Sequence, residues 1–93
     1  MAVVLDPDTI DDRSPDGWTR EGDAIEATYE FDDYLAGVGF ASGVAGLAQE
    51  AYHHPTIEIG FRSVTVRLTT HDAGGVTDAD LDLAARIDSL DRD

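Results

Sequence analysis

The chain has 93 residues, with 20 aspartates and glutamates against six arginines and no lysine, and its formal net charge is −14. A surface of that charge repels nucleic acid and anionic membranes, and the lack of cysteine excludes disulfides, a thiolate nucleophile and cysteine-ligated zinc. The length predicts one domain over residues 1–93, and because neither a membrane-length apolar run nor a basic, apolar leader is recognisable, we expect a cytoplasmic protein.

The N-terminal third of the chain predicts a short helix followed by a β-hairpin. Asp6 can cap a helix over residues 6–12, with Pro7 at its first position, and the turn-forming residues that follow keep it short. Strands are expected at residues 17–20 and 24–31, joined by a tight turn. Apolar and polar residues alternate through the second strand, which is typical of an antiparallel sheet with one buried face.

The rest of the chain predicts a long helix, a second hairpin and a final helix. The aspartates at 32–33 can cap a helix that runs to about Ala51, strands are expected at 57–61 and 63–69, and Thr77 can cap the last helix. The apolar residues of the long helix recur at helical spacing: Tyr34, Leu35, Val38, Ala41, Val44 or Ala45, Leu47 and Ala48. The order α-β-β-α-β-β-α predicts an α+β fold, a four-stranded antiparallel sheet with two or three helices packed on one face.

The acidic residues are spread along the chain, and two interpretations of them compete. A chain with a high net charge and few apolar residues stays disordered. In a salt-adapted protein the charges are screened instead, because the Debye length falls to about 3 Å at 1 M salt. The regular apolar periodicity and the hydrophobic content of 42% favour the folded, salt-adapted interpretation.

The three histidines are predicted to meet at one end of the second hairpin. His53 and His54 precede its first strand and His71 follows its second, and a turn near residues 62–63 places residue 54 opposite residue 71. Histidine has an ordinary pKa near 6.5 and can donate and accept protons at neutral pH, so one interpretation is an acid–base pocket. Two alternatives stay open. One is a tri-histidine metal site, which the opposite directions of adjacent side chains disfavour, and the other is one loop histidine beside two structural ones.

These motifs resemble those of the pterin-4a-carbinolamine dehydratases. The usual pattern of that family is HHP, an aromatic-containing strand, a strand that ends in T-H-D or T-H-E, a glycine-containing turn and a helix that opens with aspartate. This chain has HHP at 53–55, then a hairpin, then LTTHDAGGVTDADLDLAARID at 68–88. The upstream GW at 17–18, the strand IEATYEF and the helix start DDYLAGVGF also follow the family order. The resemblance covers about residues 17–90.

The resemblance implies an α+β fold, dimers or tetramers, and the loss of water from 4a-hydroxytetrahydropterin to give quinonoid dihydropterin. It implies a catalytic trio of His53, His54 and His71. Contacts to the pterin are implied for His53, His54, Pro55, Thr70, His71, Asp72 and Ala73. Asp80 matches the family's helix aspartate and is expected to support the site, although it fits equally well as a partner of the helix dipole. No metal or organic cofactor is implied, and the expected partners are a small pterin and further copies of the chain.

Four positions depart from the family pattern. Gln49 stands where the family often has an acid, and Ile57 where an aromatic residue is common. Phe61 replaces a tyrosine and Ala27 an arginine. The changes at Gln49 and Ile57 motivate a second hypothesis, in which the chain keeps the fold as an oligomeric interaction or regulatory module with weak catalysis.

Overall fold

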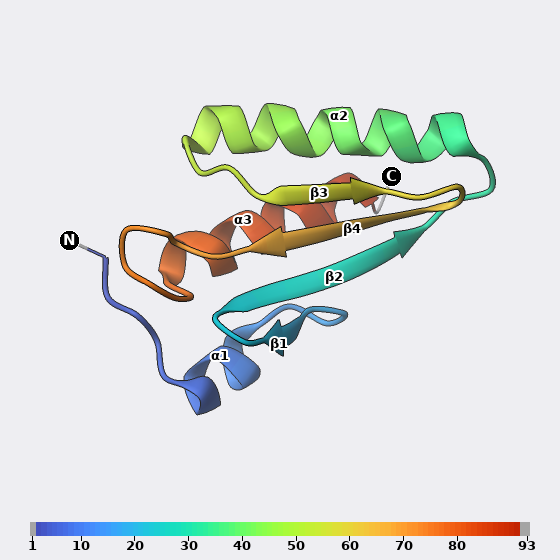
Figure 1. Cartoon of the computed structure of the whole chain (residues 1–93). Coiled ribbons are helices and arrows are strands. Elements are labelled where there is room, and N and C mark those ends of the chain that lie inside the picture. The colour runs from blue at the N-terminus through green and yellow to red at the C-terminus, as the bar shows by residue number, and fades with distance from the viewer. Residues whose placement is uncertain (1, 92–93) are drawn as a thin grey trace.

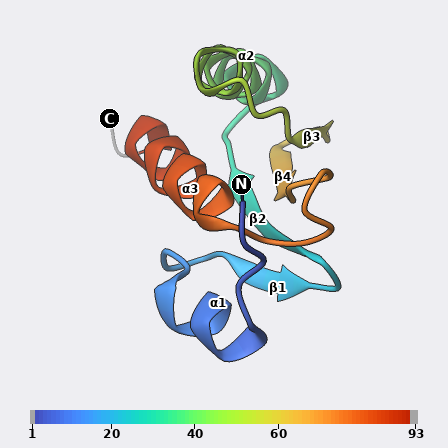
Figure 2. The same cartoon turned by 90° about the vertical axis from the view of Figure 1, so that its left-hand side faces the viewer.

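The computed structural model describes residues 2–91, in which three helices and four strands follow one another in the predicted order (Figure 1). The helices are α1 (Pro7–Arg13), α2 (Tyr34–Ala51) and α3 (Asp78–Asp91), and the strands are β1 (Thr19–Glu21), β2 (Ala24–Glu30), β3 (Thr56–Ile59) and β4 (Ser63–Leu68). The predicted α+β class is confirmed, with the helices on one side of an antiparallel sheet (Figure 2). Of the predicted span 1–93, residues 1, 92 and 93 lie outside the described residues.

Side-chain caps fix the starts of the first two helices. The carboxylate of Asp6 accepts the backbone N–H of Thr9 at 2.9 Å, and that of Asp33 accepts the N–H of Ala36 at 2.8 Å. Each cap satisfies one N–H group that has no partner within the helix, and such a cap stabilises a helix by about 1 kcal/mol. Both helices therefore begin where the sequence predicts.

The sheet has the strand order β1-β2-β4-β3, and every neighbouring pair is antiparallel. The chain leaves β2 at one end of the sheet, runs back along α2, and enters β3 at the far edge, so that β4 fills the gap between β2 and β3 (Figure 1). The C-terminal end of α2 is thereby brought beside the end of β4. These two chain segments form the site described below.

The core lies between the sheet and the helices. Ile25 of β2 and Val64, Val66 and Leu68 of β4 are completely buried, and they share the face that the helices cover. Fully burying an aliphatic side chain of this size stabilises the fold by about 1.5–3 kcal/mol. The alternating residues on the opposite face are polar, as the strand patterns predict.

The register of the second hairpin differs from the predicted one. Thr56 pairs with Arg67, and the N–H of Gly60 donates to the carbonyl of Ser63 at 2.8 Å. The turn therefore consists of residues 61–62, one position earlier than predicted, and residue 54 falls level with residue 69 instead of residue 71. A shift of two positions keeps every side chain on its predicted face, because side chains alternate with a period of two.

The first turn of α2 also differs from the prediction. Ala41, Val44 and Ala48 are buried as predicted, but Tyr34 is 54% exposed and Leu35 is 77% exposed. Both belong to the first turn of α2, and this end of the helix lies where β3 turns into β4 (Figure 1). Within residues 2–91, no helix combines the length and the apolar character that crossing a bilayer requires.

Candidate active site

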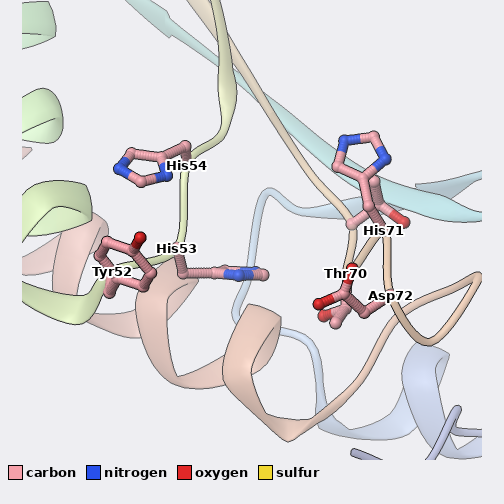
Figure 3. A pocket seen from close by; sticks show the side chains of 7 residues that line it. Tyr52, His53, His54, Thr70, His71 and Asp72 are labelled. Atoms are coloured by element: carbon pink, nitrogen blue, oxygen red, sulfur yellow. The ribbon is translucent and has the colours of Figure 1, made fainter.

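A pocket of about 210 Å³ lies where the chain leaves α2 and where it leaves β4 (Figure 3). Its lining residues come from these two segments only: Tyr52, His53, His54, Thr69, Thr70, His71 and Asp72. Pockets for drug-sized ligands measure roughly 300–1,000 Å³, so this one suits a smaller molecule or one end of a larger one.

The end of α2 sets the directions of the first two histidines. Tyr52 follows the last helical residue in the left-handed conformation, with φ 53° and ψ 44°, and the N–H of His53 donates to the carbonyl of Ala48 at 3.0 Å. This reversal ends the helix and turns the chain toward β3. His53 then points toward the loop after β4, whereas His54 points back toward Tyr52 (Figure 3).

A buried carboxylate holds the imidazole of His53. Asp80 of α3 is completely buried, and its Oδ1 lies 2.5 Å from Nε2 of His53. Its Oδ2 accepts the hydroxyl of Thr70 at 2.7 Å and the backbone N–H of Thr77 at 2.9 Å. Asp80 therefore joins three segments of the chain and, through Thr77, also caps the start of α3.

This network determines which nitrogen of His53 can face a ligand. An ionised carboxylate only accepts hydrogen bonds, so with Asp80 in its ionised form Nε2–H of His53 is the donor of this bond. Nδ1 is then the nitrogen that remains for chemistry in the pocket. The side chain of His53 is 16% exposed, so the ring is held at the pocket wall with limited freedom to move.

The other two histidines belong to the open side of the pocket. His54 and His71 are both exposed, and the ring of His54 makes an edge-on contact with that of Tyr52 at a centroid distance of 5.6 Å. The loop that carries His71 is closed by the N–H of Thr70, which donates to the carbonyl of Gly75 at 3.0 Å. Gly74 has φ +82°, which glycine adopts without strain, and so permits this tight loop.

The structure gathers most of the site residues expected from the sequence. Five of them line the pocket: His53, His54, Thr70, His71 and Asp72. Asp80 lies beneath the pocket, in contact with His53. Pro55 is half-buried and outside the lining, and Ala73 lines a neighbouring hollow together with Ala2, Thr70 and Asp72.

Two lining residues, Tyr52 and Thr69, were not predicted as site residues. The only sequence signal for Tyr52 is its position directly after the predicted helix end, and the two-position shift in register brings Thr69 level with residue 54. Ile57 is half-buried against the core and does not line the pocket. In the part of the chain that the structure describes, no group of three or more histidine, aspartate or glutamate side chains is arranged to hold a metal ion.

Three imidazoles thus line one small pocket on an α+β scaffold, and a buried carboxylate beneath the pocket holds one of them. The family model for pterin 4 alpha carbinolamine dehydratase matches residues 4–90. A protein that carries this family's name in Natronomonas pharaonis is 58% identical over 90 residues, which cover 97% of this chain and 98% of the relative. One from Haloarcula marismortui is 52% identical over the same coverage. The chain thus belongs to the pterin-4a-carbinolamine dehydratase family, whose named activity is that of a hydro-lyase.

Two solved structures share the fold. The crystal structure of a transcriptional coactivator/pterin dehydratase from Brucella melitensis has a TM-score of 0.87 and 27% identity, covering 94% of this chain and 97% of that one. A pterin dehydratase-like protein, described as a RuBisCO assembly factor in the alpha-carboxysome, has a TM-score of 0.63 and 26% identity. That match covers 78% of this chain and 84% of the other.

Proposed function

We propose that the histidine pocket removes water from a 4a-hydroxytetrahydropterin and gives the quinonoid dihydropterin. The observation that carries the proposal is the meeting of His53, His54 and His71 around one small pocket in a chain of this family. The names of the relatives support the same substrate class.

The reaction is a balanced acid–base step. The bond between C4a and its hydroxyl oxygen breaks, and an acid protonates the oxygen so that it leaves as water. A base removes the proton from the adjacent ring nitrogen, whose electron pair forms the new double bond to C4a. One proton is given and one is taken, so two groups that titrate near neutral pH are sufficient and no oxidant or reductant is needed.

The three histidines divide this work according to their surroundings. Because Asp80 occupies Nε2 of His53, this ring offers the substrate a single nitrogen in a fixed direction, which suits binding and orientation. His54 and His71 are exposed to solvent and can exchange protons with water between turnovers. In this proposal they are the acid and the base.

The proposal is tested by following the loss of a chemically generated 4a-carbinolamine in molar KCl, with and without the protein. We expect an acceleration over buffer of about 100-fold or more, because positioned acid–base groups contribute about 10²–10⁴-fold. His71→Ala should lose most of it, whereas Leu35→Ala, an exposed position at the other end of α2, should keep it. A wild-type rate equal to the buffer rate would overturn the proposal.

A second candidate function is an oligomeric interaction or regulatory module. Large apolar side chains are exposed in the first turn of α2, with Tyr34 at 54% and Leu35 at 77%, and in the turn between β3 and β4, with Phe61 at 77%. These two segments lie at the end of the molecule opposite the ends of α2 and β4 that form the pocket (Figure 1). The titles of the two similar structures name a coactivator and an assembly factor, which favours association with other chains.

Light scattering at micromolar concentration in molar KCl tests the module. We expect a homodimer or homotetramer for the wild type and a smaller species for Leu35→Ser/Phe61→Ser, because the double substitution removes apolar surface that an interface would bury. The dehydration rate distinguishes this function from the first, since both substitutions lie far from the histidines. A wild-type chain that stays monomeric would argue against the module.

A further inference from the structure

Tyr52 places a large, exposed side chain on a left-handed backbone, where the fold requires the backbone conformation but not the tyrosine. It is the only non-glycine residue with positive φ among residues 2–91, and its side chain is 84% exposed. Left-handed backbone is sterically unfavourable for a residue with a Cβ atom, which is why glycine and asparagine are preferred directly after a helix. A large aromatic side chain in water at such a position gains little from packing.

The hydrogen bonds at this position depend on the backbone alone. The N–H of Tyr52 donates to the carbonyl of Gln49 at 3.2 Å, and the N–H of His53 donates to that of Ala48 at 3.0 Å. Glycine would form both bonds without the strain. The tyrosine side chain is therefore not explained by the way in which α2 ends.

The side chain does have a place in the pocket. Tyr52 is the only lining residue with a phenol ring, and the others are histidines, threonines and Asp72. Its ring meets that of His54 at 71°, edge-on, with the centroids 5.6 Å apart (Figure 3). Binding sites for small ring systems usually combine apolar or aromatic surface with a few polar groups, and in this lining Tyr52 is the residue that supplies such surface.

We propose that the ring of Tyr52 is a contact surface for the flat ring system of the pterin, and that a tyrosine is retained at this left-handed position because the position presents the ring beside His54. This inference rests on the pterin substrate proposed above. It assigns Tyr52 to substrate binding and not to proton transfer. Its removal should therefore raise KM or Kd and leave kcat nearly unchanged.

The test compares wild type with Tyr52→Phe, Tyr52→Asn and Tyr52→Gly by titration calorimetry with 7,8-dihydrobiopterin in molar KCl. Aromatic contacts of this kind contribute about 0.5–1.5 kcal/mol, which corresponds to a Kd raised roughly 2- to 12-fold. We expect this rise for both Tyr52→Asn and Tyr52→Gly, and a Kd near that of the wild type for Tyr52→Phe. Tyr34→Ala, at the other end of the same helix, should bind like the wild type.

Unfolding midpoints of the same proteins distinguish an effect of each substitution on pterin binding from an effect on folding. Tyr52→Gly should unfold at a higher denaturant concentration than the wild type, because the strained position is relieved, and yet it should bind the pterin more weakly. A purely structural residue would not change stability and affinity in opposite directions. If Tyr52→Gly and Tyr52→Asn bind as tightly as the wild type, the inference is wrong while the proposed dehydration stands. If the wild type binds no pterin, both fail.

Discussion

At the scale of the residue, Asp80 has two tasks that depend on the same buried carboxylate. Its Oδ2 accepts hydrogen bonds from the hydroxyl of Thr70 and from the N–H of Thr77 at the start of α3, and its Oδ1 contacts Nε2 of His53. The sequence led us to expect either a support for the site or a partner of the helix dipole, and the geometry combines both. Asp80 therefore fixes both the imidazole of His53 and the start of its own helix, α3.

Asp80→Asn separates the two tasks. If the amide oxygen takes the place of Oδ2 and keeps Thr70 and Thr77, the amide NH₂ faces Nε2 of His53, which must then become an acceptor and move its proton to Nδ1. We expect kcat/KM to fall about 5- to 150-fold, because Nδ1 of His53 then offers the substrate a donor in place of an acceptor and a hydrogen bond worth about 1–3 kcal/mol is lost. The free energy of unfolding should fall by only about 1–3 kcal/mol, the cost of exchanging one charged hydrogen-bond acceptor.

Nitrogen NMR of the histidine rings reports the tautomer of His53 directly, and denaturant titration reports the stability. Asp82→Asn is the matched control, since Asp82 is an exposed carboxylate two positions further along α3. It should leave the tautomer and the rate unchanged. A His53 ring that keeps its wild-type signature in Asp80→Asn would contradict the role given to Asp80.

At the scale of the element, α3 is fastened to the sheet near both of its ends. Near the start of α3, Asp80 contacts His53. Near the end of α3, Asp88 accepts hydrogen bonds from the hydroxyl of Tyr29 at 2.5 Å and from the indole N–H of Trp18 at 3.1 Å. Tyr29 belongs to β2 and is buried, and burial together with the Asp88 carboxylate raises the pKa of its phenol well above the ordinary value of 10. The folded protein therefore keeps the proton of Tyr29 in alkali.

This raised pKa predicts a loss of stability in alkali. Above about pH 10 the unfolded chain releases the Tyr29 proton and the folded chain does not, so the free energy of unfolding falls by up to about 1.4 kcal/mol per pH unit. The contribution of the Tyr29 proton to the free energy of unfolding is fully present below about pH 10. Guanidinium titrations between pH 8 and pH 11 measure it.

Tyr29→Phe is the control for the alkaline effect. It should be less stable than the wild type at pH 8, because the bond to Asp88 is lost, but its stability should decline less steeply above pH 10. Equal slopes for the two proteins would show that Tyr29 is not the group responsible.

The helices and strands could be predicted from the sequence because each depends on local patterns. The alternation through β2 and the caps at Asp6 and Asp33 gave the correct faces and starts. The exact turn of the second hairpin could not be predicted, since Phe61, Arg62 and Ser63 fit several turns equally well and the pairing with β2 helps to decide between them.

Most residues of the site could be predicted from the sequence, but the contacts between them could not. Hairpin geometry brings His53, His54 and His71 to one end of the sheet even with a register error of two positions. The contact between His53 and Asp80 depends on how α3 packs beside the end of α2, and a chain separation of 27 residues gives no local signal of it. The left-handed backbone of Tyr52 is equally hidden, because its residue type argues against that conformation.

At the scale of the whole molecule, the net charge of −14 determines how strongly the carboxylates repel one another at a given salt concentration. The described residues extend over 38 × 24 × 21 Å. At 0.01 M salt the Debye length is about 30 Å, so carboxylates repel one another across the whole molecule, whereas at 1 M it is about 3 Å and only neighbours interact. Relatives from Natronomonas pharaonis and Haloarcula marismortui fit the prediction of salt adaptation.

We therefore expect the urea midpoint of unfolding to rise steadily as KCl is raised from millimolar to molar concentration. A variant in which the exposed acids Asp12, Asp16 and Glu58 are replaced by Asn, Asn and Gln should show a weaker dependence, because it carries three fewer negative charges. A midpoint that does not change between millimolar and molar KCl would contradict salt adaptation.

Dehydration of a 4a-hydroxypterin by the histidine pocket is tested by the rate of carbinolamine loss with wild type and with His54→Ala/His71→Ala. Both are measured in molar KCl under single-turnover conditions, after circular dichroism has shown that the variant is folded. We expect the wild type to exceed the buffer rate about 100-fold or more and the double variant to fall within a few-fold of buffer. Full activity in the folded double variant would contradict histidine acid–base catalysis in this pocket.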